Sequence, residues 1–432
     1  MARNYAPSLR APMIPYLTSE EPVWSPMLTF LGEPGSGAFV NLPGNMPTGG
    51  VEPYVCIAPV RNFYLLSEER AQSIGQPWVL GTIRPQIVRD LQQGRCLLLL
   101  DLSNEGAPYV KDVFDDIHAW AGARGIPPHA IMLVTQNRRL LIEERAQHGH
   151  QAIHLACYDF FIRSLAGLFA QDDADFQRTV GFAPAAVIEA IDSEKERRFL
   201  CLNATARPYR IAFVALLRSL GLLSDVLLSF HGNKASAKQG ASTMAEVEYV
   251  LKELDVTGLR ELARELLEAD PVFADAVEKR GNELAETIDF APYSRTAISL
   301  VTETDFTDGS MERVTEKTLK PLCLGHAAVV VGNPASLPFL RQLGFETFAP
   351  FVDESYDAEL NPRQRFALLR DEVVRLGGGP DRQLPPAARE LCRHNARHAR
   401  AGFLNTYLKT VEQPFLRDVA RSLASLRSED AL

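Results

Sequence analysis

The feature that most restricts the fold of this chain is a repeated alternation of short apolar runs with helix-like segments. The apolar runs at residues 97–100 and 130–135 read as strands that are buried on both faces. Residues 109–124, which lie between them, have the composition and spacing of a helix. Strands that alternate with helices at this spacing form a parallel sheet covered by helices. The sequence therefore predicts an α/β fold.

The same alternation starts again after the charged stretch at residues 192–198. The 432 residues exceed what one hydrophobic core usually supports, so we expect two Rossmann-like domains that face a cleft. A helical insertion is expected at 242–268, where Thr243 and Glu246 fit a capping box. The expected divisions are an irregular Pro/Gly-rich arm at 1–50, an acceptor-side domain at 51–192, a nucleotide-sugar-binding domain at 193–385, and C-terminal helices at 386–432 that pack back on the first domain.

Composition and charge narrow the classes of function. A formal net charge of −9 argues against a general nucleic-acid-binding protein, which needs a basic surface. No apolar run is long enough to span a bilayer, so no transmembrane segment is expected. The six cysteines are scattered singly, without a CxxC pair, which is typical of reduced thiols in a cytoplasmic protein.

Three patterns that suggest a metal site are set aside, so no metal is predicted. Asp173-Ala-Asp175 resembles a DxD motif but follows a helix-like segment, where the motif would end a strand. His394 and His398 are four residues apart without a third ligand. A third group of histidines also lacks a set of partners: His148, His150 and His154.

Residues 297–332 carry the clearest indication of a binding site. An apolar run ends in Glu303, a polar loop follows, and a helix is expected to open at Thr315 with Glu316 and Lys317 in its first turn. Free N–H groups at a helix start and a neighbouring lysine can face an anion together.

Further polar residues are expected at strand-to-helix turns of the same domain. Arg207 and Arg210 follow the apolar run at 199–202, Asn203 lies on that same turn, and Arg313 precedes Thr315. Because such turns open onto one edge of a sheet, we expect these side chains to surround the phosphates and ribose of a nucleotide sugar.

The series from Glu303 through Arg313-Val-Thr-Glu-Lys317 to the apolar run ending at Gly332 resembles the donor-site signature of the α1,3-fucosyltransferases. These are inverting, metal-independent enzymes of the glycosyltransferase B (GT-B) fold. The resemblance implies that Lys317 contacts the nucleotide diphosphate, that Glu316 holds the ribose and that Glu303 faces the donor sugar. The family has a tyrosine where this chain has Arg313. A GDP-linked donor is the form that the resemblance favours, with no separate cofactor.

Inversion needs a base that takes the proton of the acceptor hydroxyl, usually a carboxylate of the first domain. Asp101 and Glu105 are the leading candidates, because they follow the most buried predicted strand, and Asp159 is a third. The expected activity is transfer of a sugar from a nucleotide-diphosphate sugar to a hydroxyl of a glycan or polysaccharide.

Two alternatives stay open at this point. One keeps the fold but uses a retaining mechanism, or a CMP- or UDP-linked donor. The other is a binding or scaffold protein with a degenerate site. The sequence does not decide between a monomer and a homo-oligomer.

Overall fold

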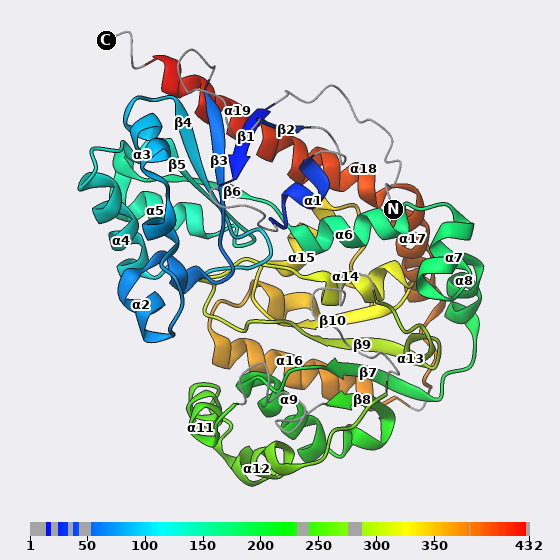
Figure 1. Ribbon diagram of the computed structural model, residues 1–432. Helices are drawn as coiled ribbons and strands as arrows, with labels where there is room; N and C mark the ends of the chain where they lie inside the picture. Colours follow the sequence, from blue (N-terminus) through cyan, green and yellow to red (C-terminus); the bar gives the residue numbers. More distant parts are fainter. Residues whose placement is uncertain are drawn as a thin grey trace. The chain divides into compact units, whose positions relative to one another are not determined.

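The computed structural model describes residues 14–18, 25–32, 38–42, 53–230, 242–274, 287–379 and 381–428. The chain divides into two compact units (Figure 1). Unit 1 consists of Met1–Arg163 together with Tyr407–Leu432, and unit 2 consists of Ser164–Thr406. Each unit is built on one sheet of parallel strands, so the predicted α/β class is confirmed.

The sheet of unit 1 has the strand order β2-β1-β3-β4-β5-β6, and every described pairing in it is parallel. All residues of β4 and β5 are buried, as the unbroken apolar runs predicted, so both faces of these strands are covered. The strands are β1 (Ile14–Thr18), β2 (Phe39–Asn41), β3 (Tyr54–Pro59), β4 (Cys96–Asp101), β5 (Ile131–Thr135) and β6 (His154–Cys157).

The helices of unit 1 come from both ends of the chain. They are α1 (Leu28–Leu31), α2 (Glu68–Ser73), α3 (Pro85–Gln92), α4 (Lys111–Gly122), α5 (Leu140–His148) and α19 (Gln413–Ser428), with the short 3-10 helices η1 (Phe63–Leu66), η2 (Val79–Thr82), η3 (Pro128–Ala130) and η4 (Gly149–Gln151) and the π-helix η9 (Leu408–Glu412). The red helix α19 runs beside this sheet in Figure 1 and contacts β4 and β6. Its apolar side chains, Phe415, Leu416, Val419, Leu423 and Leu426, belong to the core of unit 1.

The sheet of unit 2 has the order β10-β9-β7-β8 and is also parallel. Every residue of β9 and β10 is buried. The central position of β9 places its C-terminal residue and the following loop beside the ends of β7 and β10. The strands are β7 (Arg197–Asn203), β8 (Val226–Phe230), β9 (Thr296–Thr302) and β10 (Ala327–Val331).

Helices of unit 2 include the predicted insertion. They are α7 (Asp173–Val180), α8 (Pro184–Asp192), α9 (Pro208–Ser219), α11 (Met244–Glu253), α12 (Arg260–Glu268), α13 (Ala291–Ser294), α14 (Glu316–Cys323), α15 (Ser336–Gln342), α16 (Pro362–Gly377) and α17 (Pro386–Ala401), with the turns η5 (Leu222–Asp225), η6 (Thr257–Leu259) and η8 (Glu354–Ala358). Helices α6 (Phe160–Phe169) and α18 (Phe403–Tyr407) cross the two boundaries between the units. In the insertion, α11 and α12 both pack on α9.

The structure corrects the expected divisions in three places. The arm at 1–50 is not irregular throughout, because β1 and β2 extend the sheet of unit 1. The boundary near 192 moves to Arg163, since α8 packs against α17 and Phe182 stacks on Phe290, 4.7 Å between ring centroids, within unit 2. The tail at 386–432 is divided as well: α17 packs on α14 in unit 2, and only the part from Tyr407 joins unit 1.

The cysteines behave as predicted: all six are free thiols, and five of them are buried. Within the described residues, no helix combines the length and the apolar character that a membrane span requires.

Candidate functional site

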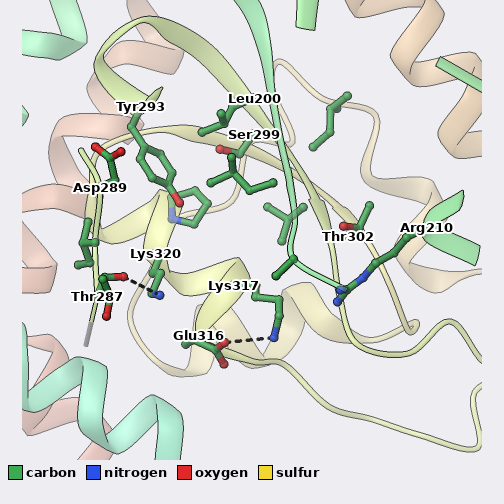
Figure 2. A pocket seen from close by; sticks show the side chains of 16 residues that line it. Leu200, Arg210, Thr287, Asp289, Tyr293, Ser299, Thr302, Glu316, Lys317 and Lys320 are labelled. Atoms are coloured by element: carbon green, nitrogen blue, oxygen red, sulfur yellow. Dashed lines mark hydrogen bonds and ion pairs between the residues drawn. The ribbon is translucent and has the colours of Figure 1, made fainter. Parts of the chain in front are cut away.

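The largest group of predicted site residues meets at a pocket in unit 2, against β7 and β9. The pocket encloses about 880 Å³ of space, the open solvent at its mouth included. Figure 2 shows its labelled side chains, which come from β7, β9, α9, the start of α14 and the stretch 287–293. It is lined by Leu200, Leu202, Ala204, Arg210, Thr287, Ile288, Asp289, Tyr293, Ser299, Leu300, Val301, Thr302, Glu316, Lys317, Lys320 and Pro321.

Helix α14 starts where the sequence predicted, because Thr315 is a favourable cap. Its backbone is extended, and its hydroxyl accepts a hydrogen bond from the backbone N–H of Lys317 at 3.3 Å. Glu316 is the first residue of the helix, where the partial positive charge of the helix end stabilises a carboxylate. The cap therefore places Glu316 and Lys317 next to each other at the pocket wall.

The carboxylate of Glu303 ties the end of β9 to the start of α14. It accepts hydrogen bonds from the backbone N–H and the hydroxyl of Thr315 at 3.0 and 2.7 Å, and from the hydroxyl of Thr318 at 2.6 Å. The backbone N–H of Thr304 donates a fourth, at 3.2 Å. Glu303 is 2% exposed and does not line the pocket. Its side chain thus holds the pocket wall in place.

Gly332, which follows β10, is required by the position of Glu303. A Cβ atom at Gly332 would lie 2.8 Å from Cβ of Glu303, closer than two carbon atoms approach without displacement. The glycine in the predicted motif therefore leaves space for the buried glutamate.

Arg210 brings a buried positive charge to the pocket. It is 3% exposed, and its guanidinium donates to the backbone oxygens of Glu303, at 2.7 and 3.0 Å, and of Thr205, at 3.2 Å. Among the described residues, no carboxylate lies within ion-pair distance of it. A buried charge that is held only by neutral oxygens is costly, and an anionic ligand would offset that cost.

Two lysines and one glutamate of α14 complete the charged wall. Lys317 Nζ lies 3.1 Å from Oε1 of Glu316, and Lys320 Nζ donates to the backbone oxygen of Thr287 at 3.1 Å (Figure 2). Burial opposes the ionisation of Glu316, but the charges of Lys317 and Lys320 outweigh it and lower the pKa of Glu316 to about 2. Glu316 is therefore a carboxylate at neutral pH, beside two ammonium groups.

Three other residues that were predicted to bind the donor do not line this pocket. Asn203 is fully buried and accepts a hydrogen bond from the hydroxyl of Thr302. Arg207 is exposed at the N-terminal cap of α9. Arg313 is buried and lies 3.3 Å from Oδ2 of Asp305 in the loop that precedes α14. Asn203 thus links the ends of β7 and β9, and Arg313 pairs within its own loop.

The carboxylates predicted as a catalytic base all belong to unit 1. Asp101 is fully buried, and its oxygens accept hydrogen bonds from the hydroxyl of Ser25 and the backbone N–H of Ser103. Asp159 is also fully buried and pairs with Arg138. Glu105 is exposed on the loop after β4. Of the three, only Glu105 offers a solvent-accessible carboxylate.

Several pocket residues were missed by the sequence reasoning. Lys320 is three residues after Lys317, so helical spacing was a usable signal that both face the same side. Thr287, Asp289 and Tyr293 belong to the stretch that enters β9, and no local motif marks them. The pocket thus combines three basic side chains with a largely apolar floor from the sheet.

Asp173 and Asp175 lie in the first turn of α7, where Asp172 caps the helix. The pattern thus begins a helix and does not follow a strand.

Comparison of the chain with protein-family models, with curated proteins and with solved structures finds no match.

Proposed function

We propose that this protein is a glycosyltransferase of the GT-B type, which transfers a sugar from a nucleotide-diphosphate donor to a hydroxyl of a glycan. The observation that carries the proposal is Arg210, a buried guanidinium with neutral partners, beside Lys317 and Lys320 at a pocket with an apolar floor. Such a pocket suits a ligand with an anionic end and a flat, less polar end, as in a nucleotide. The α/β fold with parallel sheets is compatible with this type of enzyme.

In this proposal the basic side chains stabilise the negative charge that grows on the departing diphosphate. Arg210 donates from a fixed position, since it is held by two backbone oxygens, and a donor that is already oriented is effective in the transition state. Lys317 and Lys320 add charge from adjacent turns of α14. Glu316, ionised at neutral pH, accepts hydrogen bonds from the ribose hydroxyls.

Two expected roles are refined. Glu303 has its carboxylate oxygens engaged by Thr304, Thr315 and Thr318, so we assign it the positioning of α14, in place of direct contact with the sugar. Among the candidate bases we favour Glu105, because Asp101 is buried and already accepts hydrogen bonds from the protein. A single base of this kind is what direct displacement with inversion requires.

The first test is titration calorimetry with GDP, UDP, CMP and dTDP. We expect one of the diphosphates to bind, and Lys317→Ala to weaken its affinity by roughly tenfold or more, since a charge-assisted hydrogen bond contributes about 1.5–3 kcal/mol. Lys252→Ala is the matched control, because Lys252 is an exposed lysine on α11 that does not line the pocket. Comparison of the four affinities also shows which nucleotide the donor carries.

The proposal fails if none of the four nucleotides binds, or if Lys317→Ala and Lys252→Ala bind the nucleotide equally well. Circular dichroism and melting of both variants establish that each is folded, so that a loss of affinity reports the missing ammonium group.

A non-catalytic nucleotide-binding protein is the second candidate. One observation favours it. The resemblance places Glu303 at the donor sugar, but both of its carboxylate oxygens accept hydrogen bonds from the protein. Incubation with the matching nucleotide sugar and a set of glycan acceptors distinguishes the two. Release of nucleotide diphosphate that depends on the acceptor supports the transferase, and tight binding without release supports the binding protein.

A further inference from the structure

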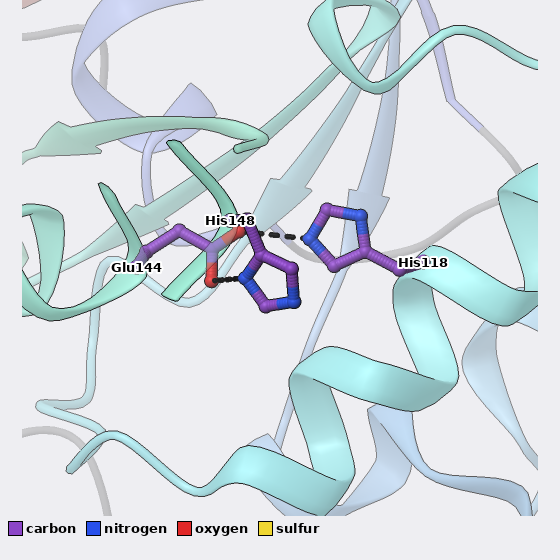
Figure 3. Close-up of side chains that lie close together, drawn as sticks. All are labelled: His118, Glu144 and His148. Carbon is purple, nitrogen blue, oxygen red and sulfur yellow. Dashed lines mark hydrogen bonds and ion pairs between the residues drawn. The ribbon is translucent and has the colours of Figure 1, made fainter. Parts of the chain in front are cut away.

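Three side chains with metal-ligating atoms meet between α4 and α5 in unit 1 (Figure 3). Oε1 of Glu144 lies 2.9 Å from Nε2 of His118, and Oε2 lies 3.0 Å from Nδ1 of His148. The two imidazole rings are stacked, with 3.9 Å between their centroids. One donor atom from each of the three residues lies within 4.8 Å of the other two. None of these residues lines the pocket of unit 2.

The sequence spacing puts these side chains on facing sides of two helices. Glu144 and His148 are four residues apart on α5, so they project from the same side of that helix. Asp115 and His118 are three residues apart on α4 and do the same. In the sequence, His148 has no evident set of metal-ligand partners. Glu144 lies four residues earlier on the same helix, but His118 comes from α4, about thirty residues earlier, so no local pattern shows the three residues together.

Glu144 is fully buried, and the only basic groups that contact its carboxylate among the described residues are the two imidazoles. In the part of the chain that the structure describes, no lysine or arginine lies within ion-pair distance of it. It accepts hydrogen bonds from the two imidazoles and, at 3.3 Å, from the backbone N–H of Ile153. A buried carboxylate needs a compensating positive charge. A cation shared with the two histidines would supply it.

We propose that His118, Glu144 and His148 bind a divalent transition-metal ion of the Zn²⁺ class. Two imidazole nitrogens and a carboxylate oxygen form the set of three protein ligands found in zinc sites that keep one position open. Zn–N and Zn–O bonds of about 2.0–2.2 Å place tetrahedral ligand atoms roughly 3.3–3.5 Å apart. The N···O distances of 2.9 and 3.0 Å, which involve the two different oxygens of Glu144, are a few tenths of an ångström shorter than this, and one donor atom of each residue lies within 4.8 Å of the other two.

The surroundings of the three ligands match the outer contacts that metal sites commonly have. Oδ1 of Asp115 lies 3.9 Å from Nε2 of His148, the ring nitrogen that does not face Glu144; this is longer than a hydrogen bond, and Oδ2 of Asp115 pairs with Lys111. Metal-bound histidines usually have a carboxylate or carbonyl on that side, and ligating carboxylates are themselves hydrogen-bonded, as Glu144 is by Ile153. The side chains of His118 and His148 are 17% and 20% exposed, so the ion has access from solvent.

The test is titration of the chelator-treated full-length protein with ZnCl₂ by calorimetry. We expect one ion per chain and a higher melting temperature in the presence of Zn²⁺, because a ligand that binds only the folded state stabilises it. His118→Ala and His148→Ala are each expected to weaken binding by at least about a hundredfold, since loss of an outer contact alone costs 10–100-fold. His150→Ala is the control: His150 is exposed, two residues beyond His148, and outside the cluster.

Co²⁺ provides a second measurement on the unmodified protein, which does not depend on how well the variants fold. Visible absorption bands of a tetrahedral Co²⁺ complex, without a thiolate charge-transfer band, support ligation by nitrogen and oxygen. A thiolate band would assign the metal to the cysteines and overturn the proposal. So would a wild-type protein that takes up no Zn²⁺, or affinities that are equal in His118→Ala, His148→Ala and His150→Ala.

Discussion

His326, behind the wall of the pocket, illustrates how burial fixes the charge of a single side chain. It is 4% exposed; its Nε2 donates to the backbone oxygen of Thr296 at 2.8 Å, and its Nδ1 accepts from the hydroxyl of Ser299 at 2.8 Å. Burial is the main cause that lowers the pKa of His326 to about 3. The neutral ring is thus fully hydrogen-bonded, and it connects β9 to the residue just before β10.

This low pKa makes a prediction about acid stability. The unfolded chain binds a proton at His326 near pH 6.5 and the folded chain only near pH 3, so the stability from the neutral ring is complete above pH 6.5 and is lost as the pH falls toward 3. Between pH 7.5 and 5 the loss is about 2 kcal/mol. Urea unfolding of wild type and His326→Gln at both pH values measures it. Between pH 7.5 and 5, the free energy of unfolding of the variant should fall by about 2 kcal/mol less than that of wild type. If the free energies of both proteins fall equally with pH, His326 has no such effect.

At the scale of elements, the start of α11 shows how much a local pattern contributes to the insertion. The hydroxyl of Thr243 accepts from the backbone N–H of Glu246 at 3.2 Å, and the carboxylate of Glu246 accepts from the backbone N–H of Thr243 at 2.7 Å, which is the predicted capping box. Thr243→Ala should lower the free energy of unfolding by about 1 kcal/mol. Urea denaturation measures this, with the exposed Thr257, which caps no helix, as the Thr257→Ala control. An equal loss of unfolding free energy in the two variants would show that the cap does not stabilise α11.

The elements that could be predicted are those whose signal lies within a few consecutive residues. The buried strands β4 and β10 are unbroken apolar runs, and the cap at Thr315 marks the start of α14. Strands β1 and β2 were missed because they are short and lie among prolines and glycines, so only their pairing with the rest of the sheet stabilises them.

The same distinction applies to the candidate site. Glu316 and Lys317 were predicted because they are adjacent to a recognisable helix start. The engagement of Glu303 by Thr318, and of Arg210 by the backbone oxygen of Glu303, depends on contacts between segments 15 and 93 residues apart. No local pattern reports contacts of that kind. The boundary at Arg163 was missed for a similar reason, since it depends on the packing of α8 against α17.

At the scale of the whole molecule, the chain leaves unit 1 after Arg163 and returns to it at Tyr407, so unit 1 is completed by the last segment of the sequence. Val419, in the middle of α19, is fully buried in the core of unit 1. If the two units unfold separately, a cavity at Val419 should weaken unit 1 and leave unit 2 unaffected. Val419→Ala removes two methyl groups from this core and should cost about 2 kcal/mol.

Hydrogen exchange read by mass spectrometry resolves this effect along the chain. A loss of about 2 kcal/mol should speed the exchange of amides in β4, β5 and β6 about 30-fold, whereas amides in β7 and β9 should exchange at the wild-type rate. Arg421→Ala is the control, because Arg421 is exposed on the same helix and pairs only with Asp418 among the described residues. Equal acceleration in both sheets would show that the units unfold together. In that case the returning segment would stabilise the whole chain, and its apolar face would matter for the stability of unit 2 as well as of unit 1.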